Sequence, residues 1–505
     1  MRKQIALSGL KPTSNLLEVD VTRVAANRIR DMDRRHVVWR IFKEINFVNI
    51  DHKPFAVAGA RLRPARTGPP DPDPTVHPMT SEENAAVEVS AARGIDLLRR
   101  GIAIAFLVTL LLSRKLWLTA RDYPLTPIWT GEPQAPYPLD HIVFWVMAAS
   151  LAAVAVLRNP RIPLRLVVAI GVLWAVLDQS RWQPYFIHYM VILACMLALP
   201  FERRKEWVTA NVDWALLPAR MTLAVTYFYS GIQKLNYQFT TDVFPWMVTP
   251  LKRMIHLDLS HWGGRWEAGM ALGAAGAEAI FGILLLHPRT RRPAALFLIC
   301  MHGFILLMIG PFGYKWNAVI WPWNCAMMLA LWSLFARKSM NSWSAPGVLT
   351  QGWWREVLSR RSFMVPGVLV AFGIMPLFNF IDRWDSYPSF SLYSGSTCKS
   401  EIEIDPADWK WMPAAAKSAI DPDTGDVDLI SWSTSELGAM PYPEHRIAMN
   451  AAISLAKRAR NGPVLIQLQS RPNPLTGVRK YRYYRLAPGT GRPSEISESV
   501  YNAEH

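Results

Sequence analysis

The sequence predicts an all-α polytopic membrane bundle of about nine transmembrane helices, followed by a small C-terminal α+β extracytoplasmic domain. Two observations predict this fold class. Apolar runs recur between residues 101 and 381, and several approach the roughly 20 apolar residues that a spanning helix needs. Turns rich in arginine and lysine alternate with turns that hold few, as the positive-inside rule describes. We therefore divide the 505 residues into an arm (1–95), a membrane domain (96–381) and a C-terminal domain (382–505).

The arm is polar, and we expect it to be largely disordered. Residues 61–78 are rich in proline and charge, as in a linker. No apolar segment follows the start, so no signal peptide is predicted. The stretch that begins at Met79 resembles a natural N-terminus. Residues 1–78 are therefore expected to be an upstream extension or the product of a mis-called start.

The nine predicted spans explain where the basic residues lie. With the N-terminus in the cytoplasm, each short inner loop is rich in arginine or lysine, for example Arg158, Arg161 and Arg165 in one loop. The outer loops hold more proline, tryptophan and tyrosine, although Lys252 and Arg253 lie among them. We expect a protein of the cell inner membrane with a periplasmic or extracellular C-terminus. The predicted spans are 101–119, 141–157, 164–178, 185–200, 212–232, 267–286, 293–310, 317–336 and 363–381.

The net charge of +16 does not indicate nucleic-acid binding, because the basic residues cluster in short loops between apolar runs. That distribution is typical of topology signals and of contact with lipid headgroups. Membrane lipids are therefore predicted partners, and nucleic acid is not. The cysteines form no CxxC pair, so neither a disulfide framework nor a metal site is predicted.

The C-terminal domain is predicted from alternating and helical patterns. Residues 400–404 and 427–432 are candidate strands, and residues 444–460 have helical spacing. Residues 463–469 and 478–485 flank a turn that contains proline and glycine, which favours a hairpin.

Lys234 is the first candidate for chemistry. It closes the fifth predicted span, in the sequence YFYSGIQKLN, and the following outer loop (236–265) contains TDVFPWMVTPL, which is too short to span and is interrupted by proline. We expect that segment to be re-entrant or interfacial. A desolvated lysine can act as a base. The alternative, which position alone favours, is a lysine that extends to the membrane interface.

Glu278 and His302 lie in the middle of consecutive spans. Glu278 follows GAAGA and is 11 residues from Arg289, while His302 is 10 residues from Arg292. Both therefore lie about 15–17 Å along their helices from the inner ends. Ionisable groups within a membrane usually face inward and pair. A proton relay or polar cavity and a structural hydrogen bond between helices are equally good interpretations.

Two groups of polar residues mark the outer ends of other spans. The turn between the third and fourth spans holds Asp178, Arg181, Tyr185 and His188, which are either binding residues or an ordinary polar loop. Asn317 and Asn324 flank Trp321 and Trp323 in the eighth span. Tryptophans there are usually interface anchors, but asparagines among them indicate an inward polar face. We assign these six polar residues as candidate substrate- or cofactor-binding residues.

The segments ARMTLAVTYFYSGIQKLN (219–236) and HPRTRRPAALFLICMHGFILLMIGPFG (287–313) resemble the membrane domain of vitamin K-dependent gamma-carboxylase and the bacterial HTTM (horizontally transferred transmembrane) proteins. SLYSG at 391–395 is similar to the start of the family's outer region. The resemblance covers residues 95–381. It implies a quinol cofactor of the vitamin K type, with Lys234 as the catalytic base and His302 and Glu278 in support.

The sequence also departs from that family. Tyr185 stands where the family has a catalytic histidine, with His188 three residues on, and only about 120 residues follow the membrane domain. Two functions therefore stay open. One is carboxylase- or oxidoreductase-like, quinol-dependent lyase chemistry at the outer face, acting on an extracytoplasmic protein. The other is a non-enzymatic membrane protein that binds quinone or lipid or scaffolds a partner.

Overall fold

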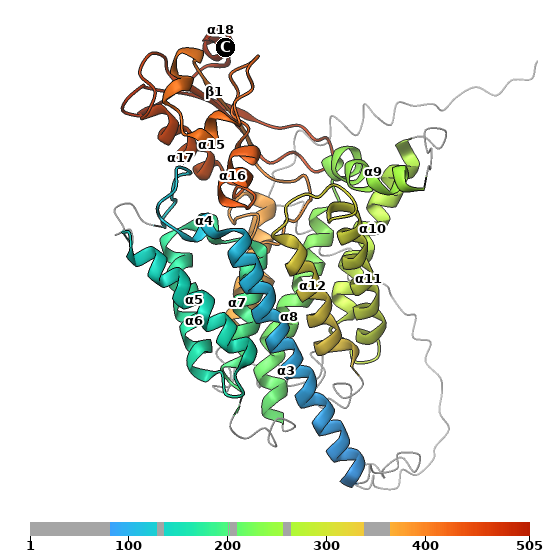
Figure 1. The fold of residues 1–505 in the computed structure, drawn as a ribbon. Coiled ribbons are helices and arrows are strands. Elements are labelled where there is room, and N and C mark those ends of the chain that lie inside the picture. Colours follow the sequence, from blue (N-terminus) through green and yellow to red (C-terminus); the bar gives the residue numbers. More distant parts are fainter. Residues whose placement is uncertain are drawn as a thin grey trace, which may run out of the picture. The chain divides into compact units, whose positions relative to one another are not determined.

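The structure is a computed structural model that describes residues 81–128, 136–199, 201, 210–255, 264–337 and 364–504. The chain forms two units, 1–77 and 78–505, and everything below concerns the second unit (Figure 1). The expectations for residues 1–80, including the linker and the start at Met79, lie outside the described residues.

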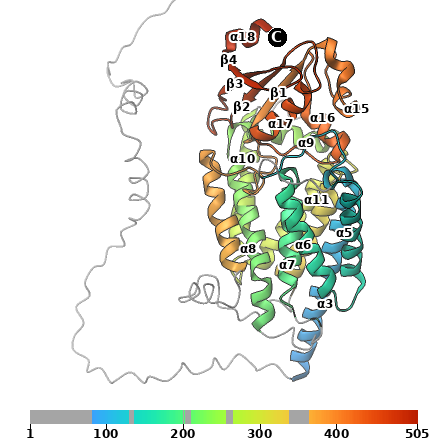
Figure 2. The same cartoon turned by 90° about the vertical axis from the view of Figure 1, so that its left-hand side faces the viewer.

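Helices that run side by side form the larger part of this unit, and the sheet lies beyond one end of them (Figures 1 and 2). Five short helices of other types adjoin the α-helices. Three are π-helices, namely η3 (Phe239–Val243), η5 (Trp332–Ala336) and η7 (Leu369–Ile374). Two are 3₁₀ helices, namely η1 (Gln179–Arg181) and η8 (Met375–Ile381). The α-helices are α3 (Ser81–Leu112), α4 (Arg114–Trp117), α5 (Leu139–Val156), α6 (Arg161–Leu177), α7 (Pro184–Met196), α8 (Ala210–Gln233), α9 (Phe244–Met254), α10 (Gly264–Leu284), α11 (Arg291–Ile309), α12 (Ile320–Leu331) and α14 (Met364–Val368).

Four helical segments among the described residues are long and apolar enough to cross a membrane. They are Leu139–Val156, Gly264–Leu284, Arg291–Ile309 and Met364–Ile381. Pro184–Met196 and Ile320–Ala336 are apolar but shorter. Each of the nine predicted spans overlaps helical residues. Among the described residues, these four segments are both long enough and apolar enough to cross a membrane, so the prediction of nine spans is not confirmed.

The first membrane-domain helix begins earlier than the sequence pattern indicated. Helix α3 runs without a break from Ser81 to Leu112, so the predicted boundary at residue 95 falls inside it. The helix is interrupted at Ser113, and α4 follows at Arg114. The predicted boundary was set by the change from polar to apolar residues, but one continuous helix can carry a polar end beyond an apolar one.

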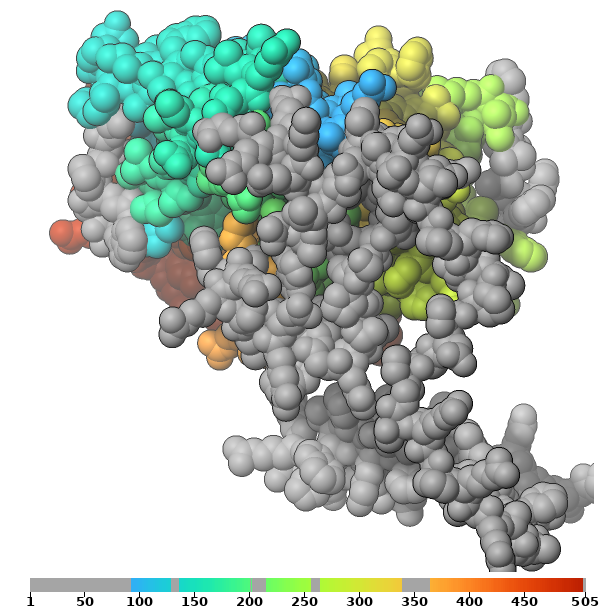
Figure 3. Space-filling model, turned by 90° about the horizontal axis from the view of Figure 1, so that it is seen from below, coloured from blue at the N-terminus to red at the C-terminus, as the bar shows by residue number. Residues whose placement is uncertain are grey.

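Helix α8 lies at the centre of the bundle. From Ala215 to Gln233 most of its side chains are buried, and a few, such as Val225 and Phe228, are partly buried. Lys234, which follows the helix, is also buried. Seen from the end opposite the sheet, the atoms of residues 139–199 (teal) and those of residues 264–337 (yellow-green) gather on different sides (Figure 3). This central position explains why α8 can carry polar side chains, which other helices shield from lipid.

The C-terminal part holds a four-stranded antiparallel sheet with the strand order β1-β2-β3-β4. Its strands are β1 (Lys399–Ile404), β2 (Val464–Gln469), β3 (Tyr481–Leu486) and β4 (Pro493–Ile496). Ile402 pairs with Ile466, and both are fully buried on the face that packs against α17 (His445–Ala456). The remaining helices are η9 (Pro406–Trp411), α15 (Ala414–Lys417), α16 (Leu429–Leu437) and α18 (Glu498–Glu504).

The sequence patterns located β1, the β2–β3 hairpin and α17 within a few residues of their observed bounds. The predicted strand at 427–432 is wrong. Val427 makes only an isolated bridge to Ile420, and α16 begins at Leu429. The Asp428 side chain accepts a hydrogen bond from the amide of Ile430 and so caps this helix, which outweighs the strand-like alternation.

Candidate functional site

The closest helix contact in the membrane domain joins α8 and α10 through two glycines. Gly231 faces the backbone of Ala275 and Ala279, and Gly282 faces the backbone of Ala224 and Phe228. A Cβ atom at Gly231 would lie 2.4 Å from the Ala279 nitrogen, so no larger residue fits without movement of the helices. Small residues commonly allow such close approach in membranes.

This contact brings Lys234 and Glu278 together. The Lys234 ammonium lies 2.8 Å from Glu278 Oε2 and 2.6 Å from Ser230 Oγ, and both charged side chains are about nine-tenths buried. The ammonium is therefore enclosed by the protein, with a carboxylate and a hydroxyl as partners. A buried charge is stable only when it is paired and hydrogen-bonded, and this arrangement provides both.

His302 lies beside this pair and bridges two other helices. Its Nε2 is 2.8 Å from the Tyr227 hydroxyl on α8, and its Nδ1 is 2.7 Å from Asn324 Oδ1 on α12. Glu278 and His302 therefore bond to different residues: Glu278 pairs with Lys234, and His302 bonds to Tyr227 and Asn324.

Asp178 and Arg181 find most of their partners in the segment 116–126, which packs against their turn. The Asp178 carboxylate lies 2.6 Å from Arg121 Nη2 and accepts hydrogen bonds from Thr126 and Ser180, while the Arg181 guanidinium donates to the carbonyls of Leu116 and Trp117. Burial raises the pKa of Asp178, but Arg121, Arg181 and these amides outweigh it and leave the pKa lowered. These contacts join their turn to the segment 116–126.

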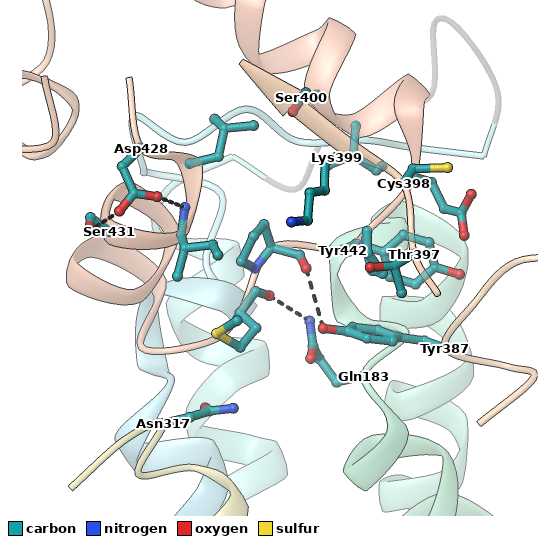
Figure 4. A pocket seen from close by; sticks show the side chains of 18 of the residues that line it. Gln183, Asn317, Tyr387, Thr397, Cys398, Lys399, Ser400, Asp428, Ser431 and Tyr442 are labelled. Atoms are coloured by element: carbon teal, nitrogen blue, oxygen red, sulfur yellow. Dashed lines mark hydrogen bonds between the residues drawn. The ribbon is translucent and has the colours of Figure 1, made fainter. Parts of the chain in front are cut away.

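A cavity of about 840 Å³ lies where the ends of α7 and α12 meet the C-terminal domain (Figure 4). Its walls include Tyr185, Asn317 and Trp323 from the membrane domain and Tyr393 and Lys399 from the C-terminal part. Apolar side chains such as Ile320, Leu392 and Ile447 complete much of the lining. A volume between 300 and 1,000 Å³ with mostly apolar walls is typical of sites for small molecules.

Several buried polar atoms on these walls have no hydrogen-bond partner among the described residues. They include the indole Nε1 of Trp323, the side-chain oxygen of Asn317 and the hydroxyl of Tyr185. The Tyr185 hydroxyl lies near Ser113, whose hydroxyl donates to the Thr109 carbonyl, accepts from the Trp117 indole and keeps a second lone pair. Buried polar groups are nearly always paired, so these atoms lack partners that a ligand could supply. Each has less than 1 Å² of accessible surface, so a ligand would reach it only after a small side-chain rotation.

The C-terminal wall adds a cation and a phenol. The Lys399 side chain points into the cavity in Figure 4, and its ammonium makes no ion pair with the other described residues. Burial raises the pKa of Tyr393 to about 12, so its hydroxyl remains a hydrogen-bond donor at neutral pH. Acidic residues such as Glu401 and Asp426 also line this side, so the positive charge at Lys399 is local.

The structure separates the predicted site residues into four groups. Tyr185 and Asn317 line the cavity. His188 and Asn324 lie behind its wall: the His188 ring is 5.6 Å from that of Trp323, and Asn324 follows Trp323 on α12. Lys234 and Glu278 form a buried ion pair, and His302 is hydrogen-bonded to Tyr227 and Asn324. Asp178 and Arg181 lie in the turn between α6 and α7. Lys399 and Tyr393 could not be selected from the sequence, because nothing in their local pattern shows that the C-terminal domain covers the helix ends.

The apolar helices define the chain as an integral membrane protein. Within it, residues 215–310 match the model of the DoxX family, which is a membrane family. No curated protein and no solved structure matches this chain.

The DoxX match overturns the resemblance to the carboxylase and HTTM proteins, because no model of that family matches. The segment 219–236 lies inside the matched range, and most of 287–313 does too. The physical reason for the error is visible in the structure. The Gly-x-x-Lys pattern allows α8 to approach α10 and bury an ion pair, which any tightly packed membrane bundle can require.

Proposed function

We propose that this integral membrane protein binds an amphiphile of the lipid or quinone class in the cavity beneath its C-terminal domain. The observation that carries the proposal is the set of unpaired polar atoms on Trp323, Asn317 and Tyr185, on the wall of an otherwise largely apolar cavity. An amphiphile matches such walls, because its apolar part contacts the aromatic rings and its polar head bonds these atoms.

The polar head is proposed to lie near Lys399. Its ammonium points into the cavity and has no acidic partner at ion-pair distance among the described residues. A phosphate or a quinone carbonyl would accept its hydrogen bonds. This placement makes Lys399 and Tyr185 the two positions at which a small change removes a ligand contact and leaves the surrounding fold unaltered.

Within this proposal Lys234 has a structural role rather than that of a base. A general base needs a free amine, and the Lys234 nitrogen is engaged by Glu278 and Ser230. Lys234 is also absent from the residues that line the cavity. Binding without turnover is therefore the function that this geometry supports best.

The test is to purify the protein in mild detergent and identify the retained lipids and quinones by mass spectrometry. Replacing Lys399 by Gln and Tyr185 by Phe together removes two polar contacts, which lowers the retained ligand about tenfold or more. The matched control carries the same changes at the exposed residues Lys457 and Tyr481. Equal recovery of the amphiphile from both double variants would refute the proposal.

A further inference from the structure

The loop between β2 and β3 (residues 470–480) exposes two large apolar side chains. Leu475 is 86% exposed and Val478 is 67% exposed. The turn itself does not need them. The Asn473 side chain accepts hydrogen bonds from the amides of Leu475 and Thr476, and Gly477 supplies the positive φ of 71°. Adjacent exposed apolar side chains in a turn usually mark an interaction surface.

The loop is fixed to the ends of two membrane-domain helices. On one side, the Tyr237 amide donates to the Pro474 carbonyl at 2.7 Å, and Tyr237 follows the end of α8. On the other side, Arg471 donates to the carbonyls of Asn379 and Trp384, where the apolar segment Met364–Ile381 ends. Leu475 and Val478 are therefore held at the level where these helices leave the bundle.

The exposed apolar surface continues from the loop onto these helix ends. Tyr237 and Leu235 are 48% and 44% exposed beside α8. Ile381 and Leu377, on the apolar segment that ends near Arg471, are 64% and 55% exposed. Side chains exposed on an apolar segment of spanning length face lipid. The surface that includes Leu475 is thus continuous with one that a bilayer covers.

We propose that the loop 470–480 inserts Leu475 and Val478 into the interfacial region of the lipid bilayer. The exposed Lys480, at the end of the loop, and the exposed Arg482, at the start of β3, are placed to contact lipid phosphates, as basic residues beside an interfacial anchor commonly do. The loop then holds the C-terminal domain over the helix ends. This inference rests on the membrane character of the chain and is independent of the ligand in the cavity.

The experiment measures the depth of a nitroxide label attached at position 475. The four native cysteines, Cys195, Cys300, Cys325 and Cys398, are replaced by alanine, and Leu475→Cys is labelled and reconstituted into vesicles of phosphatidylcholine and phosphatidylglycerol. Thr490→Cys is the matched control, because Thr490 is exposed on the turn at the opposite end of β3. Accessibility to oxygen reports lipid, and accessibility to a nickel chelate reports water.

We expect the label at 475 to be more accessible to oxygen than to the nickel chelate, with the reverse at 490. Equal preference for the nickel chelate at both positions would overturn the proposal. So would shielding of position 475 from both reagents, which indicates a protein contact. If the cysteine-free protein does not fold, p-benzoylphenylalanine is placed at position 475 or at position 490 of the native sequence instead. The proposal predicts a photo-crosslink to lipid from position 475 and none from position 490.

Discussion

The Lys234–Glu278 pair is the best test of how single residues stabilise this bundle. Replacing either Lys234 by Met or Glu278 by Leu leaves an uncompensated buried charge, and we expect each change to lower the free energy of unfolding by about 3–5 kcal/mol. The double replacement removes both charges, so it should be less destabilised than either single variant. Thermal unfolding in detergent measures all three.

A double variant that is destabilised by the sum of the two single changes would contradict this role, since it would mean that the two side chains act independently.

Ser230→Ala is a milder comparison. It removes one of the two short contacts of the ammonium and keeps the ion pair, so a loss of about 1 kcal/mol is expected.

Cys398 provides a pH-dependent probe of the cavity wall. Burial, together with Glu444, raises the pKa of its thiol to about 11, although Arg471 opposes this. Only the thiolate reacts with iodoacetamide. The alkylation rate should therefore rise about tenfold per pH unit from pH 8 to pH 10 without levelling off, in a variant whose other cysteines are alanine. A plateau near pH 9 would show that the thiol has its ordinary pKa.

The candidate residues differed in how well the sequence could place them. Glu278 and Lys234 were identified because charged groups in apolar runs are rare, and their burial follows from the same fact. Their pairing with each other was not predicted. Counting residues along a helix gives the depth of a side chain but not which helix it faces, and here the close approach of α8 and α10 at Gly231 and Gly282 brings the two together. Asp178 and Arg181 attracted attention as polar residues, yet their partners Arg121, Leu116 and Trp117 lie more than 50 positions away.

Among the helices, the α8–α10 contact should be the least tolerant of added volume. Gly231→Ala and Gly282→Ala each place a methyl group against backbone atoms of the other helix, and we expect losses of about 1–3 kcal/mol. Gly276→Ala is the matched control on α10, because a Cβ there has nothing within 4 Å. That change should be neutral or slightly stabilising in thermal unfolding. An equal effect at all three positions would contradict the close packing.

Hydrophobic and alternating patterns located most elements, because they depend on residues close in sequence. The apolar segments Leu139–Val156 and Arg291–Ile309 and the strands β1, β2 and β3 lie close to their predicted positions. Helix α16 was missed because its start depends on the Asp428 cap rather than on periodicity. Strand β4 was missed because only four residues form it, and most of them are exposed.

In the unit as a whole, the C-terminal domain is held to the helix ends by buried polar contacts. The Glu436 carboxylate accepts hydrogen bonds from the amides of Asp122 and Tyr123 and from the Trp432 indole. Glu436→Ala leaves these donors without a partner, which costs about 1–3 kcal/mol. We expect faster amide hydrogen exchange at residues 122–123 and in α16, with no change after Glu495→Ala on the exposed strand β4. Unchanged exchange in the Glu436 variant would show that other contacts hold the domain.

This contact between domains also explains why the cavity could not be predicted from sequence. Its walls combine residues near positions 123, 185 and 320 with residues near 393, 399 and 445. No local pattern connects segments that far apart. The sequence did identify Tyr185 and Asn317 as outer polar residues, and the fold then places both on the same wall.

The most direct measurement of the central claim is an electron cryo-microscopy map of the full chain extracted into lipid nanodiscs from its own membrane. The account predicts density for one amphiphile in the cavity, with its polar head within hydrogen-bond distance of Tyr185, Asn317 or Trp323 and near the Lys399 ammonium. A well-ordered cavity that contains only water on these polar atoms would contradict it.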